Sequence, residues 1–471
     1  MGTKVPVSDA DKQPEGMLQR TYTLLGDSPD MRARTLGLFA FFFLVIAAFW
    51  VQKPIRTSRF LTAVGSEYLP LVKLGTALLL LPVALLYSSL AGRYRRESLV
   101  YLCVAAFAAA SVTFWWIFSR SADGGTAWSS YVYFFYVDIF NSVMVALFWS
   151  FANDLTAPDQ ARRTYGVVGA GGIVGGIAGS ALTGWSVERI GAPNLLLICV
   201  ALLAAIALVA RLVARPYERA EGIAQPARSE ASWREAVAGA RLTFTSRYLT
   251  TVALVVVAYE IVSNIIDFQF NTIIGSRYHD EAVIAAFLGR FSTASNIASL
   301  IVQLVLTTWV LRHWGPRVGL LVLPLVLGLG SAGFLVVPAF AVVAATFFGD
   351  AALGYSLNQT SKEVLYTPTD EKTKYQAKAF IDMFLMRFAK GMSSLLILAS
   401  MAWWLPRTSN NVHWLSALSV AIVIGWITVA YAAARAFAQQ TAPDHARAPA
   451  PAWGSSHSAV DDLDAQPSGA R

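Results

Sequence analysis

The sequence predicts an all-α membrane protein with twelve transmembrane helices, built as two parallel repeats of six. Hydrophobic residues make up 56% of the 471 positions and charged residues only 14%, whereas roughly a quarter of the residues are charged in soluble domains. Apolar stretches long enough to cross a bilayer as a helix, about 20 residues, recur along the whole chain. Two polar turns at equivalent places in the two halves share one pattern. A soluble fold could not bury so much apolar surface.

Six spans are expected in the first half of the chain, at residues 35–60, 68–91, 98–119, 128–152, 164–187 and 193–210. In the second half, the uncharged run 318–349 is too long for one span, and Pro338 indicates a break within it. We therefore expect six more spans, at residues 248–273, 282–311, two between 318 and about 364, 376–403 and 414–434.

The distribution of basic residues predicts the orientation, because cytoplasmic loops carry an excess of Lys and Arg. The loops on one side hold groups such as Arg93, Arg95 and Arg96, whereas each loop on the other side holds at most one arginine. Both termini are then cytoplasmic, and we expect a multi-pass protein of the bacterial inner membrane. The domains expected are an N-terminal tail (1–34), a six-helix bundle (35–213), a central cytoplasmic loop (214–247), a second bundle (248–437) and a disordered tail (438–471).

The two polar turns indicate an internal duplication. The turn between the fourth and fifth spans reads PDQARRTY (158–165), and that between the tenth and eleventh spans reads PTDEKTKY (368–375). Both begin with Pro, place acids before bases and end with Tyr. Parallel repeats of six helices are typical of major-facilitator transporters, in which the substrate site lies between the halves near the membrane midplane.

The charges around these turns are candidates for a cytoplasmic gate that holds the halves together in the outward-open state. A solvated turn without this role is the alternative. The candidate gate residues are Asp154, Asp159, Arg162, Arg163, Lys362, Glu363, Asp370, Glu371, Lys372 and Lys374.

The fifth span is unusually rich in glycine. A phosphate-binding loop is excluded by its context, since no strand precedes the glycines and no Gly-Lys-Ser/Thr follows them. Small residues four apart instead allow helices to pack closely in lipid. Helix packing is therefore the expected role, with direct ligand contact as the alternative, for Gly172, Gly175, Gly176 and Gly179.

Several ionisable and polar residues fall inside the expected spans, where they are costly unless they face a partner or a water-filled cavity. Spans one, four, seven and ten line the cavity of the parallel-repeat fold, and all four contain such groups; the tenth contains Asp350. The candidate substrate-binding residues are Lys53, Arg56, Asp138, Asn141, Glu260, Asn264, Asp267, Arg290, Arg387 and Lys390.

This set of side chains suits an anionic substrate with hydrogen-bonding groups, such as a phosphorylated metabolite. Opposite charges that pair in the empty site and separate when substrate binds would couple occupancy to a conformational change. The alternative is that the charges form structural salt bridges only.

Four stretches resemble one transporter family. FWSFANDLTAPDQARRTYGVVGAGG (148–172) and KEVLYTPTDEKTKYQAKAFID (362–382) are similar to motifs of the ATP/ADP antiporters of plastids and intracellular bacteria. GSEYLPLVK (65–73) and YEIVSNIIDFQF (259–270) are weaker matches in the same order. The resemblance implies nucleotide exchange, or nucleotide import with protons. It also implies that Arg56, Asp138, Glu260 and Lys390 carry the functional charges, with Arg and Asp where the family has Lys and Glu.

The leading hypothesis is therefore a secondary active transporter that exchanges or imports nucleotides or related phosphorylated metabolites by alternating access. A proton-coupled exporter of an organic anion or drug, and a non-transporting membrane sensor or scaffold, are the alternatives. Cys103 and Cys199 lie in apolar runs, and none of the five histidines lies in mid-span. We expect neither an enzyme nor a cofactor or metal site, no nucleic-acid partner, and a monomer in the lipid bilayer, with protons as a candidate co-substrate.

Overall fold

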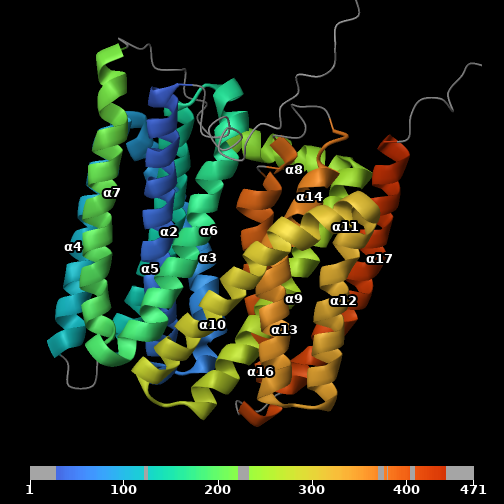
Figure 1. Ribbon diagram of the computed structural model, residues 1–471. Coiled ribbons are helices and arrows are strands. Elements are labelled where there is room, and N and C mark those ends of the chain that lie inside the picture. Colours follow the sequence, from blue (N-terminus) through green and yellow to red (C-terminus); the bar gives the residue numbers. More distant parts are fainter. Residues whose placement is uncertain are drawn as a thin grey trace, which may run out of the picture.

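The computed structural model describes residues 28–120, 126–220, 233–369, 376–378, 380–403 and 409–441. In this part of the chain the protein is all-helical, and it forms two bundles that stand side by side (Figure 1). Eleven of the described helical segments are long and apolar enough to cross a membrane. The remaining expected span, 376–403, is described only in part. The described chain begins and ends at the same end of the molecule, the upper end in Figure 1.

The N-terminal bundle contains six long helices, each within a few residues of its expected span except where noted. They are α2 (Pro29–Ala63), α3 (Leu69–Arg93), α4 (Arg96–Arg120), α5 (Ala127–Leu155), α6 (Pro158–Ile190) and α7 (Ala192–Ala220), with the short 3₁₀ turn η1 (Ser66–Tyr68) before α3. Helix α2 begins inside the expected tail, because Ser28 caps it by accepting a hydrogen bond from the Met31 amide. Helix α7 continues past the expected end of its span into the central segment.

The second bundle follows the helix α8 (Trp233–Thr245), which lies in the segment expected to be a loop. Its elements are α9 (Arg247–Arg277), α10 (Glu281–Ile301), η2 (Val302–Thr307), α11 (Thr308–His313), α12 (Gly315–Val336), α13 (Phe340–Leu353), η3 (Gly354–Asn358), α14 (Gln359–Leu365), η4 (Ile381–Leu385), α16 (Met386–Trp403), η5 (Ser409–Trp414) and α17 (Leu415–Thr441). Pro338 lies between α12 and α13, where the sequence predicts a break.

Three spans of the second bundle contain a π-helical segment, and the described helices of the first bundle contain none. These segments are η2, η3 and η4. A π-helical turn inserts a residue into the regular ladder, and such turns occur frequently at functional sites. The two bundles therefore share a topology but differ in the regularity of their helices.

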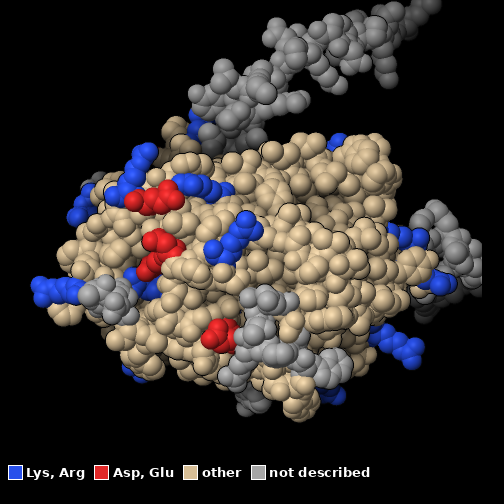
Figure 2. Space-filling view, turned by 90° about the horizontal axis from the view of Figure 1, so that it is seen from below, with Lys and Arg blue, Asp and Glu red and all other residues tan. Residues whose placement is uncertain are grey.

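Each bundle has an apolar core of its own, and two further clusters contain residues of both bundles. The larger of these contains Phe60 and Phe134 from the first bundle and Ile265 and Phe270 from the second. Direct contacts between the bundles lie toward the end where α2 and α6 end and α10 begins, the lower end in Figure 1; Gly289 there packs on Gly184. Seen from this end, the surface is mostly uncharged, with a few small groups of Lys, Arg, Asp and Glu (Figure 2).

Helix α6 packs against α2 through its glycines. A Cβ atom added at Gly175 or Gly179 would lie less than 3.0 Å from the main-chain oxygen of Phe43 or Ala47, respectively. At Gly172 the added atom would meet the Phe42 ring, and at Gly176 it would approach Trp50 and Asn296. The backbones thus approach each other as in small-residue interfaces between membrane helices.

Replacing Gly179 with alanine should destabilise the protein, because the new methyl group has no space beside Ala47. We expect a loss of about 1–3 kcal/mol, seen as a lower midpoint of thermal unfolding in detergent. Gly169→Ala is the matched control on the same helix, since nothing lies within 4 Å of its added Cβ. Equal midpoints for the two variants would contradict the packing role of Gly179.

Candidate functional site

The first bundle contributes a partly buried ion pair between α2 and α5. Arg56 donates from Nη1 to Oδ1 of Asp138, and its guanidinium lies 4.0 Å from the centre of the Phe134 ring. Arg56 Nε is buried and has no hydrogen-bond partner among the described residues. Asn141 follows Asp138 by three positions on α5 and is half-buried. The pair thus joins two helices of the same bundle and leaves one guanidinium donor unused.

The second bundle contributes a pair between α9 and α16. Lys390 Nζ lies 3.5 Å from Oε2 of Glu260. The Glu260 side chain is 6% exposed, whereas that of Lys390 is 56% exposed. The carboxylate is therefore fixed in the interior, and the flexible ammonium can be reached by a solute.

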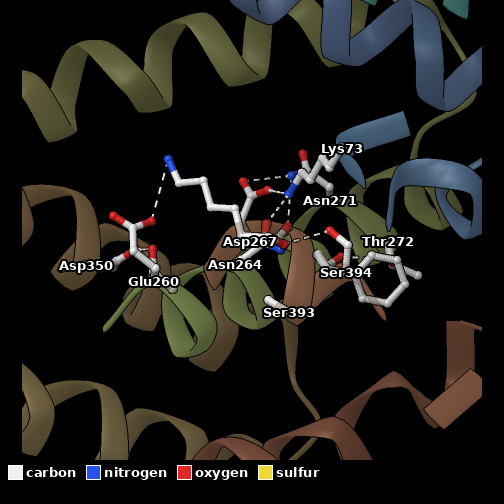
Figure 3. A network of polar contacts seen from close by, with 12 residues as sticks. Lys73, Glu260, Asn264, Asp267, Asn271, Thr272, Asp350, Ser393 and Ser394 are labelled. Carbon is white, nitrogen blue, oxygen red and sulfur yellow. Dashed lines mark hydrogen bonds and ion pairs between the residues drawn. The ribbon is translucent and has the colours of Figure 1, made fainter. Parts of the chain in front are cut away.

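A third ion pair crosses between the bundles (Figure 3). Lys73 on α3 donates to Asp267 Oδ2 and, over 2.7 Å, to Asn264 Oδ1, both on α9. Asn271 donates to the other carboxylate oxygen of Asp267 over 3.0 Å. Asn264 and Asp267 were predicted as site residues, but Lys73 was not. A lysine inside the apolar span 68–91 was the signal that could have identified it.

Lys53 is the cation of this region whose charge is least compensated. It lies one turn before Arg56 on α2, with Nζ 4.2 Å from the centre of the Trp50 ring, and it forms no ion pair with a described carboxylate. Its ammonium interacts electrostatically with charges on both bundles, namely Arg56, Asp138, Asp267 and Lys390. The predicted charges Lys53, Arg56, Asp138, Glu260, Asp267 and Lys390 are thus brought into one polar centre between the halves.

Asp350 on α13 lies beside this centre and forms no ion pair with a described cation. Ser263 of α9 donates a hydrogen bond of 2.5 Å to its Oδ2. Figure 3 shows Asp350 next to Glu260, at the end of the network away from Lys73. The sequence predicts Asp350 as an ionisable residue of the tenth span but not as a substrate-binding residue.

Two predicted site residues lie elsewhere. Arg290 on α10 donates to the Gly184 carbonyl over 2.7 Å and to Glu188 Oε2 over 2.8 Å, where the bundles meet at the lower end of Figure 1. Arg59 makes a second such contact, through two hydrogen bonds to Glu281. Arg387 is half-buried on α16 and forms no ion pair with a described residue. Arg290 thus closes one end of the interface in this conformation and does not join the central pairs.

The described gate residues pair within their own bundle. Asp154 pairs with Arg96, Glu363 with Lys378 over 2.6 Å, and Lys362 with Asp382 over 3.1 Å. Arg163 is exposed. Four further candidate gate residues lie outside the described residues, namely Asp370, Glu371, Lys372 and Lys374. The side chains of two others, Asp159 and Arg162, are not described. At this end the structure therefore contains within-bundle pairs, whereas cross-bundle pairs form at the opposite end.

The sequence is similar to those of known nucleotide transporters. The plastidic ATP/ADP-transporter of Solanum tuberosum is 25% identical over a match that covers 89% of this chain and 76% of that protein. ADP,ATP carrier protein 1 of Chlamydia trachomatis is 25% identical, covering 77% of this chain and 81% of the relative. ADP,ATP carrier protein 3 of Rickettsia felis is 22% identical, covering 75% and 84%.

The fold is similar to those of solved membrane transporters. The nucleoside transporter NupG superposes with a TM-score of 0.58 at 14% identity, covering 87% of this chain and 100% of that one. A bacterial homologue of ferroportin in an inward-facing state superposes with a TM-score of 0.59 at 15% identity, covering 86% and 99%. These likenesses confirm the predicted major-facilitator-like fold. A model described as the TLC ATP/ADP transporter matches residues 124–437, more than half of the chain, and the chain therefore belongs to this membrane transporter family.

Proposed function

We propose that this protein exchanges or imports nucleotides of the ATP/ADP type across the bacterial inner membrane, with both termini in the cytoplasm. Relatives from plastids, Chlamydia and Rickettsia are named ATP/ADP transporters or ADP,ATP carriers. Membership of this family does not favour a drug exporter or a non-transporting scaffold. The proposed orientation rests on the groups of Lys and Arg in the loops of one side.

The observation that carries the proposal is the placement of Lys53 and Lys390. They lie on different bundles, interact with each other electrostatically, and neither ammonium is held by a short ion pair. A chain of phosphates can neutralise both at once, which would bring the bundles together around the substrate. Arg56 adds an unused guanidinium donor beside Lys53. Asp138, Asn141, Glu260 and Asn264 then remain to contact the ribose or base, or to pair with the cations in the empty site.

We propose further that the transport cycle exchanges two sets of ion pairs. In this conformation the bundles are held at the lower end by Arg59 with Glu281 and by Arg290 with Glu188. In the alternate conformation these pairs would separate, and the charges around Asp154 and Glu363 would pair across the bundles at the cytoplasmic end. Alternating access then opens the polar centre to one side at a time.

The function is tested with the purified full-length chain in proteoliposomes. Uptake of labelled ATP and ADP is expected, and it should increase when unlabelled nucleotide is enclosed, because exchange needs a counter-substrate. If uptake does not depend on enclosed nucleotide, the transporter is an importer rather than an exchanger. Absence of uptake of any nucleotide by correctly inserted protein would contradict the proposal.

Lys53→Gln should weaken nucleotide binding without affecting insertion. A hydrogen bond to a charged group contributes roughly 1.5–3 kcal/mol, so we expect the concentration for half-maximal uptake to rise about tenfold or more. Arg241→Gln is the control, because Arg241 is an exposed cation on α8, away from the polar centre. An unchanged half-maximal concentration in the Lys53 variant would exclude this lysine as a phosphate ligand.

The Arg56–Asp138 pair offers a test of binding against structure. Removing one partner of a fully buried pair costs about 3–5 kcal/mol, whereas replacing both partners by apolar residues of similar volume is often nearly neutral. The variant with Arg56→Met and Asp138→Leu together should therefore unfold at nearly the wild-type temperature, yet fail to transport. Wild-type transport by this double variant would show that the pair serves only to hold α2 against α5.

A further inference from the structure

The carboxyl group of Asp350 is enclosed in the second bundle. Asp350 is 5% exposed. Ser263 donates to one of its oxygens, and the other oxygen, Oδ1, is buried without a hydrogen-bond partner among the described residues. An ionised carboxylate in such a place would be uncompensated, which is costly in a membrane. A protonated carboxyl is neutral and needs no cation.

The charged and titratable groups around Asp350 do not compensate the charge of an ionised Asp350 carboxylate. On α9, Glu260 and Asp267 add negative charge, and Tyr259 is a neighbouring phenol. On α16, Lys390 is the cation in electrostatic contact, but its ammonium pairs with Glu260. Helix α10 carries Glu281 and Arg290, which pair with residues of the first bundle, and helix α12 carries only Arg317, in its first turn. Tyr355, on η3, is a further phenol nearby.

Glu260 and Asp350 therefore share one lysine. With both carboxyls ionised, the group formed by Glu260, Asp350 and Lys390 carries one excess negative charge, and one bound proton makes it neutral. In this structure Lys390 pairs with Glu260, so Asp350 is the carboxyl that is left to bind the proton. Helix α13 becomes π-helical at Gly354, so the carboxyl lies one turn before an irregular segment of the same span.

We propose that Asp350 is a proton-binding site of the transport cycle and carries one proton in the same direction as the anionic substrate. A proton from water forms an O–H bond at the free carboxylate oxygen, and the bond breaks when the proton returns to water on the other side. Phosphates bound near Lys390 add negative charge, which favours the neutral carboxyl. By reciprocity, the bound proton favours the anionic substrate. The inference rests on the proposed nucleotide transport and assigns the residue that binds the proton.

The test compares uptake with and without a pH gradient in proteoliposomes that contain the full chain and enclosed ADP. For the wild type, one unit of external acidification should raise accumulation of labelled ATP by up to about tenfold, the ratio that one coupled proton can supply. The ratio of uptake with the gradient to uptake without it should fall to about one in Asp350→Asn and be retained in Asp350→Glu. Asp280→Asn is the control, because this exposed residue caps α10 and asparagine caps equally well.

A second measurement does not depend on transport. The infrared carbonyl band of a protonated carboxyl group should be present in the purified wild type and reduced in Asp350→Asn. The proposal is overturned if this band is unchanged by the substitution, or if Asp350→Asn keeps the wild-type response to the gradient. If the wild type transports no nucleotide but the band is lost in the variant, the proposed function fails while Asp350 remains a proton-binding site.

Discussion

The absence of water in the bilayer is the constraint on which the rest of the structure depends. Charged side chains at this depth are tolerated only when other groups of the protein compensate them. The chain meets this condition with pairs that each join two helices, such as Arg56 with Asp138 and Glu260 with Lys390. The same helices contribute to the apolar cores, α2 and α5 to that of the first bundle and α9 to that of the second. Only the cations that remain accessible can then bind an anionic substrate.

The helices could be predicted from the sequence because the signal for each is local. Runs of about 20 apolar residues located the spans to within a few residues, Pro338 located a break, and the spacing of the glycines in α6 matches the close approach to α2. The central helix α8 was missed, since an amphipathic helix of 13 residues carries a weak signal. The π-helical segments were missed as well, because their sequence differs little from that of a regular helix.

The site was predicted in part, and the reason lies in how the bundles meet. Residues on one helix, such as Glu260, Asn264 and Asp267, share a face by their spacing, so their grouping follows from the sequence. The partners across the interface cannot be predicted from the sequence in this way, because they depend on the relative position of two separately packed bundles. Lys73 reaches Asp267 in this way, and Arg290 reaches Glu188 instead of the polar centre. No local pattern distinguishes these two fates for a cation in a span.

The distribution of pairs within and between the bundles has an electrical consequence. Two carboxylates of the polar centre, Asp138 and Glu260, are compensated by cations of their own bundle. When a bundle rotates as a rigid body, both charges of such a pair move together, and the pair carries no net charge through the membrane field. An isolated charge crossing 100 mV would change in energy by about 2.3 kcal/mol. The membrane voltage thus has little effect on these paired charges, and it acts instead on unpaired charges, those of the cargo included.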